Sequence, residues 1–171
     1  SNYANPVLVN CYIHNNTSTG VYAQPGNVQI SGGTIENNSS YGIYIYDNVN
    51  DDIHTTVDDV AIQNNPGYGI YIHGSYSTPT ITNCVIDSNN SGSSGYGIYV
   101  TSSAMPVIGG SAANLNTFSN HLSYAVYNNT ASKCIDATHN FWGIAGGPLD
   151  TGFGQDDCLD MGNNNHGAER V

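Results

Sequence analysis

The stretch Gly42-Ile43-Tyr44-Ile45 decides the fold, because four imperfect copies of it recur along the chain. The copies begin at residues 20, 69, 97 and 125, so successive copies lie 22, 27, 28 and 28 residues apart. A tyrosine stands just ahead of four of the five copies, at Tyr41, Tyr68, Tyr96 and Tyr124. Self-similarity at one period is the signature of a repeat architecture, in which each copy builds one structural unit.

Two further apolar positions recur upstream of each copy. The first column comprises Leu8, Ile30, Val57, Ile81 and Ile108. The second column comprises Ile13, Ile35, Ile62, Ile86 and Phe118. Within the tetrapeptide the apolar residues alternate with period two, as they do in a strand with one buried face. Each repeat is therefore expected to contain three short strands that send alternate side chains into a core.

The repeat length selects among repeat folds. No repeat carries the ten or more residues of helical periodicity that a crossover helix needs, which argues against βαβ units and leucine-rich repeats. Propeller blades need repeats of about 40 to 50 residues. The pattern predicts one all-β domain, a parallel β-helix (solenoid) of about six coils with an irregular C-terminal cap. Residues 1–139 are expected to form the coils, and residues 140–171 the capping segment.

Asparagine pairs follow the second apolar column in most repeats. Coils of a β-helix stack about 4.8 Å apart, so equivalent side chains form ladders along the axis. Stacked amides can hydrogen-bond to the coils above and below while the backbone turns. We therefore interpret the pairs as a structural corner ladder. The pairs are Asn15–Asn16, Asn37–Asn38, Asn64–Asn65 and Asn89–Asn90.

An outward column of tyrosines is the most distinctive predicted surface feature. It comprises Tyr22, Tyr44, Tyr71, Tyr99 and Tyr127, flanked by a column of Gln24, Tyr46, His73, Thr101 and Asn129. An amphipathic aromatic strip can stack on sugar rings and offer hydrogen bonds, which makes glycan binding a hypothesis. The strip can equally stabilise stacked strands, or contact a protein partner. The candidate binding residues are Tyr22, Tyr44, Tyr46, Tyr71, His73, Tyr99 and Tyr127.

The charge balance excludes two classes of partner. Two Lys and Arg stand against 13 Asp and Glu, which gives a formal net charge of -11. Such a chain repels phosphate backbones and anionic bilayers, so we expect no nucleic acid partner. No run of about 18 apolar residues could cross a bilayer, so we expect no membrane insertion. Only 9% of residues are charged, so Asn, Ser, Thr, Gly and Tyr must supply the polar surface.

The four cysteines divide into two kinds. Cys11 and Cys84 occupy one repeat column three coils apart, roughly 14 Å, which is beyond disulfide reach. They are expected to be buried free thiols. Cys134 and Cys158 flank the end of the repeat, and a disulfide between them would pin the C-terminal tail. That disulfide would agree with an oxidising compartment.

Two acidic clusters could hold Ca²⁺, because carboxylate oxygens and glycine-rich turns suit that ion. The better candidate is the tail cluster of Asp150, Asp156, Asp157 and Asp160. The other spans residues 47–59. Neither matches an EF-hand loop or the glycine-rich nonapeptide array, and a solvated acidic loop remains the alternative for both. No other cofactor is expected.

Residues 137–148, ATHNFWGIAGGP, carry a family resemblance. They resemble the last coil of secreted bacterial right-handed parallel β-helix repeat proteins, and residues 165–171, NHGAERV, resemble their closing segment. The resemblance implies a right-handed parallel β-helix, a C-terminal cap and an extracellular, bacterial-like location. It leaves function open, because the superfamily includes polysaccharide lyases, epimerases, adhesins and structural modules.

The expected function depends on residues that β-helix enzymes use and that this sequence lacks in its coils. β-helix lyases generally use Lys or Arg near the substrate carboxylate, and the only two here, Lys133 and Arg170, lie outside the main coils. We expect a non-catalytic extracellular module, structural or adhesive, that contacts a polysaccharide or cell-surface glycan through the tyrosines. One alternative is a fragment of a polysaccharide-active enzyme (lyase, epimerase or hydrolase) with its site on the loops at 46–56, 90–95 and 109–114. Another is a filament or scaffold subunit that stacks end to end on copies of itself.

Overall fold

The computed structural model describes residues 5–25, 27–50, 54–89, 95–121, 124–130, 133–143 and 159–160, and within them every regular element is a strand. The larger sheet contains β1 (Val7–His14), β3 (Gln29–Glu36), β5 (Thr56–Asp58), β6 (Ala61–Gln63), β8 (Thr80–Thr82), β9 (Val85–Asp87), β11 (Val107–Ile108), β12 (Thr117–Ser119), β14 (Ile135–Asp136) and β15 (Leu159–Asp160). The smaller sheet contains β2 (Val21–Ala23), β4 (Ile43–Tyr46), β7 (Ile70–His73), β10 (Tyr96–Thr101) and β13 (Tyr124–Asn129).

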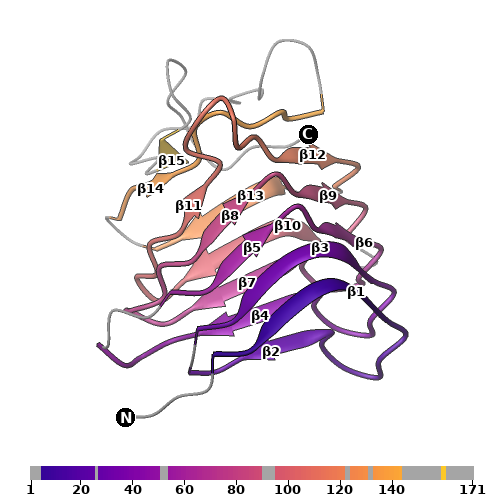
Figure 1. The fold of residues 1–171 in the computed structure, drawn as a ribbon. Helices are drawn as coiled ribbons and strands as arrows, with labels where there is room; N and C mark the ends of the chain where they lie inside the picture. The colour runs from indigo at the N-terminus through magenta and orange to yellow at the C-terminus, as the bar shows by residue number, and fades with distance from the viewer. Residues whose placement is uncertain are drawn as a thin grey trace.

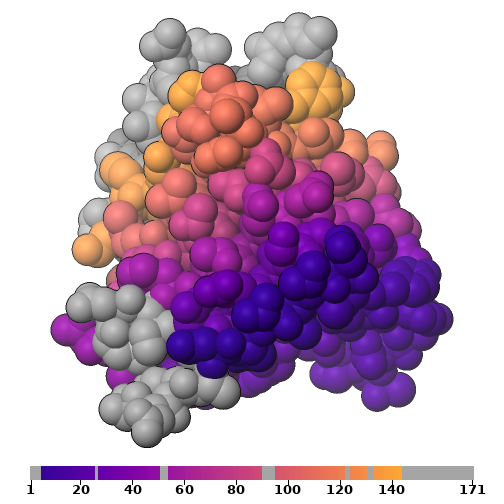
Figure 2. Space-filling view, in the orientation of Figure 1, coloured from indigo at the N-terminus to yellow at the C-terminus, as the bar shows by residue number. Residues whose placement is uncertain are grey.

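The chain winds through both sheets once per repeat, which is the geometry of a parallel β-helix (Figure 1). In the first two coils, β1 and β3 run continuously through what later coils divide into two strands. β3 accordingly pairs with β5 along its first half and with β6 along its second half. Every pair of strands is parallel and joins one coil to the next. Figure 2 shows the result on the surface, where the colour changes in layers from the N-terminal to the C-terminal end.

The register confirms all three predicted columns of the repeat. Leu8 lies opposite Ile30, and the column continues through Val57, Ile81 and Ile108. The second column runs from Ile13 through Ile35, Ile62 and Ile86 to Phe118. The third joins Val21, Ile43, Ile70, Ile98 and Val126. Nearly all of these side chains are buried and together form one continuous core along the axis.

The predicted asparagine ladder is present at the corner between the second and third strands. The side-chain amide of Asn16 donates to Oδ1 of Asn38 at 2.7 Å, Asn38 donates to Asn65 at 3.1 Å, and Asn65 donates to Asn89 at 2.8 Å. The same amides also donate to main-chain carbonyls, as Asn65 does to Ile35 O at 3.2 Å. Each rung thus replaces the backbone pairing that the turn removes.

The residue before each rung adopts a positive φ, which Asn tolerates better than most residues. The values are 55° for Asn15, 53° for Asn37, 54° for Asn64, 51° for Ser88 and 55° for Asn120. The fourth corner pair is therefore Ser88–Asn89. The predicted pair Asn89–Asn90 was wrong by one residue, because Ser88 occupies the turn position and Asn89 the ladder.

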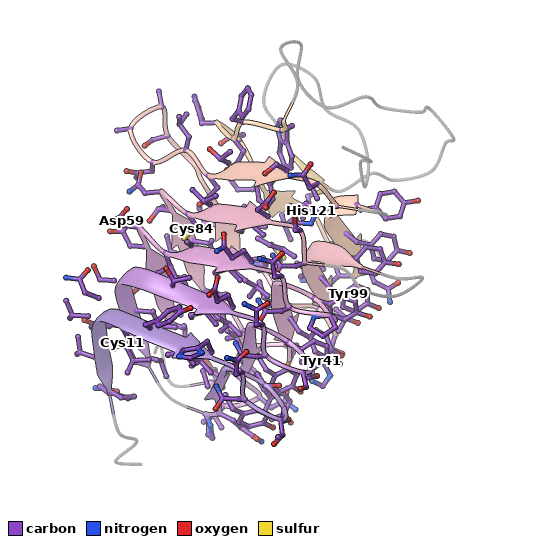
Figure 3. The ribbon with its side chains drawn as sticks, turned by 90° about the vertical axis from the view of Figure 1, so that its right-hand side faces the viewer. Cys11, Tyr41, Asp59, Cys84, Tyr99 and His121 are labelled. Atoms are coloured by element: carbon purple, nitrogen blue, oxygen red, sulfur yellow. The ribbon has the colours of Figure 1, made fainter. Side chains whose placement is uncertain are left out.

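The fifth rung of the ladder is a histidine. Nε2 of His121 lies 3.0 Å from the carbonyl oxygen of Ile86 and must donate, because a carbonyl only accepts. Nδ1 of His121 is buried without a partner among the described residues. Burial lowers the pKa of His121 to about 4, so the ring is neutral at pH 7. Figure 3 labels this side chain near the C-terminal end of the ladder.

The C-terminal end of the described coils is covered by an aromatic pair. Trp142 is only 4% exposed, and its ring stacks on Phe118 with centroids 4.9 Å apart. Asn140 Oδ1 accepts from the Asn116 backbone N–H at 3.1 Å, which starts a second corner ladder. Trp142 thus extends the buried core beyond Phe118, whereas the capping role of residues 140–171 stays a prediction.

The cysteine predictions need one correction. Cys84 is buried, as expected, and Cys11 is half-buried. Cys134 is an exposed free cysteine in the structure, so the predicted Cys134–Cys158 disulfide is not supported. Cys134 lies just before β14, where the chain re-enters the larger sheet, and Cys158 lies outside the described residues. Without that disulfide, the cysteines give no support for an oxidising compartment.

Candidate functional site

The smaller sheet presents two adjoining columns of tyrosine. The predicted column is in exact register, with Cα partners running from Tyr22 through Tyr44, Tyr71 and Tyr99 to Tyr127. A second column, Tyr41, Tyr68, Tyr96 and Tyr124, packs against the first. We call these nine residues the tyrosine plate. Figure 3 places Tyr41 and Tyr99 on the side of the solenoid opposite Cys11 and Asp59.

The rings of the plate stack on one another. Ring centroids lie 4.8 Å apart for Tyr22–Tyr44, 4.8 Å for Tyr68–Tyr99 and 4.9 Å for Tyr96–Tyr127, with interplanar angles of 14–23°. Because neighbouring rings cover each other's faces, the plate turns mainly ring edges and hydroxyl groups toward solvent. Ring edges carry the positive part of the aromatic quadrupole.

Tyr71 interrupts this stacking at the centre of the plate. Its ring lies at 63° to Tyr41, 62° to Tyr44 and 76° to Tyr68. Edge-to-face packing of this kind is as favourable as offset stacking. At the first coil, Tyr22 is 60% exposed. The plate therefore offers an available ring face at its first-coil end and a change of ring orientation in its middle.

Polar side chains bind the phenol groups along one rim. Tyr22 Oη donates to Gln24 Oε1 at 2.6 Å. Tyr46 Oη accepts from Asn48 Nδ2 at 2.6 Å, and Tyr99 Oη accepts from Asn129 Nδ2 at 2.7 Å. In the latter two bonds the phenol oxygen is the acceptor, so its own hydrogen is not used and can be donated to a ligand.

Three phenols near the centre of the plate have raised pKa values. Burial, and then the neighbouring tyrosines, raise the pKa of Tyr68 to about 12. The same two causes, in the same order, raise the pKa of Tyr44 and Tyr71. These three phenols therefore keep their hydroxyl hydrogens throughout the neutral and mildly alkaline range.

All seven predicted binding residues come together on this face. Tyr46 and His73 lie in register beside the plate, and their rings stack with centroids 5.1 Å apart. The His73 Nδ1 atom lies 3.4 Å from Tyr44 Oη. Sequence reasoning left out the second tyrosine column and Asn48. The signal for that column was present, since a tyrosine stands just ahead of four of the tetrapeptides.

The predicted calcium residues are not brought together within the described residues. Asp160 lies on β15 opposite Asp136, whereas Asp150, Asp156 and Asp157 lie outside the described residues. In the other cluster, Asp47 Oδ1 accepts from the Val49 backbone N–H at 2.8 Å, a local turn contact. Across the described ranges, no three His, Cys, Asp or Glu side chains lie close enough to hold a metal ion. Calcium binding at the tail stays a prediction.

Comparison with known proteins gives a family but no individual relative. Residues 1–142 match the family described as right handed beta helix region. No curated protein and no solved structure matches the chain. Within the part of the chain that the structure describes, no helix is long and apolar enough to cross a membrane. The match covers most of the chain and agrees with the parallel coils, so the protein belongs to the right-handed β-helix family.

Proposed function

We propose that the protein is a non-catalytic, extracellular binding module that holds a linear glycan along the tyrosine plate. The observation that carries this proposal is the plate itself, nine phenols in continuous ring contact across five coils. Half-exposed aromatic surface on this scale, with a polar rim, is typical of interaction sites.

The shape of the plate favours an extended chain lying along the axis. Five strands at about 4.8 Å spacing make the plate about 19 Å long. Positive ring edges and phenol hydrogens along this length suit the oxygen-rich edge of a polysaccharide. The exposed ring of Tyr22 can stack on one terminal sugar. With a net charge of -11, the protein favours a neutral polysaccharide over an anionic one.

The residue types of the plate argue against turnover. Neither the plate nor its flanking residues Gln24, Tyr46, Asn48, His73 and Asn129 include a carboxylate, Lys or Arg. Hydrolysis of a glycoside generally needs a pair of carboxyl groups, and elimination needs a base beside a group that neutralises the substrate carboxylate. Binding without turnover is the function that these residues support.

The test is affinity electrophoresis and calorimetry with a panel of soluble neutral polysaccharides (β-glucan, xylan, mannan), with pectin as the anionic comparison. Saturable binding that Tyr71→Ala weakens at least tenfold would support the proposal. Tyr76→Ala is the control, because Tyr76 is an exposed tyrosine that lies outside the plate. Absence of binding to every neutral polymer, or equal losses in both variants, would refute a glycan role for the plate.

Self-association is a second candidate, favoured by the edge of β1. This eight-residue strand pairs only with β3 among the described strands, and Val7 and Val9 are each 58% exposed. An unpaired apolar edge can add a strand from another molecule. Sedimentation over a concentration series tests this function. A mass that rises with concentration, and that Val9→Lys returns to the monomer, would support it; a constant monomer mass would exclude it.

A further inference from the structure

We propose that the tyrosine plate is a modification site, at which a peroxide-driven one-electron oxidant joins tyrosines of neighbouring coils through dityrosine bonds. The inference is independent of glycan binding. It rests on the ring geometry that the stacked coils impose.

The geometry matches what phenoxyl coupling needs. Two phenoxyl radicals combine through overlapping, offset rings, with an ortho carbon of one close to an ortho carbon of the other. Tyr68–Tyr99 and Tyr96–Tyr127 have ring centroids 4.8 Å and 4.9 Å apart and planes within 23° of parallel. Each pair is diagonal, because Tyr99 lies opposite Tyr71 and Tyr127 lies opposite Tyr99 in the parallel register. The paired coils fix both backbones, so the diagonal partners are already oriented. Pre-orientation of this kind gives each ring a very high effective concentration next to its partner, so coupling is much faster than between free tyrosines.

Continuity of the plate brings the second radical next to the first. Tyr68, for example, contacts the rings of four other tyrosines, Tyr41, Tyr71, Tyr96 and Tyr99. A radical formed at any exposed ring can therefore pass to neighbouring rings about 5 Å away. Tyr12 provides the contrast: its ring stacks on His14 and its hydroxyl group bonds Glu36.

The chemistry balances with one peroxide per cross-link. Each of two phenols gives up one electron and its hydroxyl proton, and the two electrons and two protons reduce one hydrogen peroxide to two waters. The two radicals form one carbon–carbon bond between ortho carbons. The hydrogen on each of those carbons then moves to its own ring oxygen, which restores both phenols. For Tyr44, the nearby Nδ1 of His73 can accept the hydroxyl proton.

Each bond would join coils that are far apart in sequence. The partners in Tyr41–Tyr68 are 27 residues apart, and those in Tyr68–Tyr99 are 31 apart. A cross-link over such a span restricts the unfolded chain in the way that a disulfide does, so the modified protein should melt at a higher temperature. Oxidation would thus strengthen the plate rather than damage the fold.

The test exposes dilute folded protein to hydrogen peroxide with a haem peroxidase, and in parallel to persulfate with a photosensitiser, whose small size reaches half-buried rings. We expect dityrosine fluorescence in the monomer fraction, an intact mass lower by two hydrogen atoms, and cross-linked peptides that pair plate tyrosines. Tyr68→Phe should lower the yield of monomer cross-link at least threefold. The control Tyr76→Phe should leave it unchanged, because Tyr76 lies outside the plate.

Three results would overturn the proposal. The first is absence of dityrosine with both oxidants. The second is dityrosine confined to covalent dimers, or mapped to Tyr12 or Tyr76. The third is an equal yield from urea-unfolded protein, since the proposal requires the folded register.

Discussion

The asparagine ladder and the tyrosine plate are both columns of one residue type repeated coil after coil, yet they differ in what their side chains do. Asn38, Asn65 and Asn89 are fully buried, and their amide groups bond the next rung or a main-chain carbonyl. The plate tyrosines are mostly half-exposed, and their main contacts are with one another. Repetition alone therefore does not separate a structural column from an interaction surface.

Burial and the saturation of hydrogen bonds distinguish the structural column from the interaction surface. In the ladder, a substitution leaves a buried donor or acceptor without its partner, which costs about 1–3 kcal/mol for each group. On the plate, water can replace a lost phenol partner. Variants of the ladder should therefore change stability, whereas conservative variants of the plate should change binding.

The largest expected effect is from Asn65→Leu. The substitution removes donors to Ile35 O and Asn89 Oδ1, and the acceptor of the Asn38 backbone N–H at 3.1 Å. We expect a loss of about 4 kcal/mol or more in the free energy of unfolding, measured by urea denaturation. The control Asn37→Gly should lie within about 0.5 kcal/mol of the native protein, because Asn37 is exposed and its φ of 53° suits glycine. Similar losses in the two variants would contradict the structural role of the ladder.

The second prediction concerns the one rung that is not asparagine. His121 has a pKa of about 4 in the folded protein, against an ordinary value of 6.5, because burial disfavours the charged ring. The unfolded chain therefore takes up this proton first. Stability is fully present above pH 6.5 and is lost as the pH falls from 6.5 to 4, by roughly 3 kcal/mol in total.

The variant His121→Asn isolates this effect. It restores the residue that fills the other rungs, so the loss of stability between pH 6.5 and 4 should largely disappear in urea denaturation followed at several pH values. Hydrogen bonds from Gln63 and Tyr12 lower the pKa of Glu36, so loss of its ionised form weakens the fold only below about pH 4.5 in both proteins. An unchanged slope above pH 4.5 in the variant would assign the acid sensitivity to other groups.

The third prediction tests how closely the smaller sheet packs on the ladder. At Gly69 an added Cβ would lie 2.6 Å from the carbonyl oxygen of Gly97 and 2.8 Å from Nδ2 of Asn89. Gly69→Ala should therefore cost about 2 kcal/mol in urea denaturation. Ala125 occupies the same column in the last copy, and Ala125→Gly is the control, expected to change stability by less. A native-like Gly69→Ala would mean that the sheet and ladder can separate without cost.

Much of the fold could be predicted because a solenoid turns sequence period into spatial register. The column from Ile13 to Phe118 was read from spacing alone, and the strands pair it as expected. Strict spacing places Ser88 at the turn position, two residues after Ile86, but the prediction followed the Asn–Asn pair instead. The same spacing places His121 at a rung position, but residue type did not show that its ring nitrogen would donate to a carbonyl as an amide does.

For the candidate site, the sequence predicted which tyrosines share a face but not how their rings lie. Alternation within Gly42-Ile-Tyr-Ile45 points Tyr44 outward. The parallel register then places Tyr22 and Tyr71 on either side of it. The tilt of Tyr71 against its neighbours depends on side-chain packing across three coils. Tyr41 joins the plate although it precedes β4, because its carbonyl oxygen still accepts from the Gly20 N–H of the preceding coil at 3.0 Å.

The smallest expected change in stability, and the sharpest test of the comparison, comes from Tyr44→Phe. The ring contacts with Tyr22 and Tyr71 remain, and among the described residues the lost hydroxyl group has a single, long 3.4 Å contact, with His73. The free energy of unfolding should stay within about 0.5 kcal/mol of the native value. Polysaccharide affinity should fall about threefold to tenfold, because one phenol donor in the row is missing. If stability fell as it does in Asn65→Leu while no affinity were lost, the plate would be a second structural ladder, and the distinction between the two columns would fail.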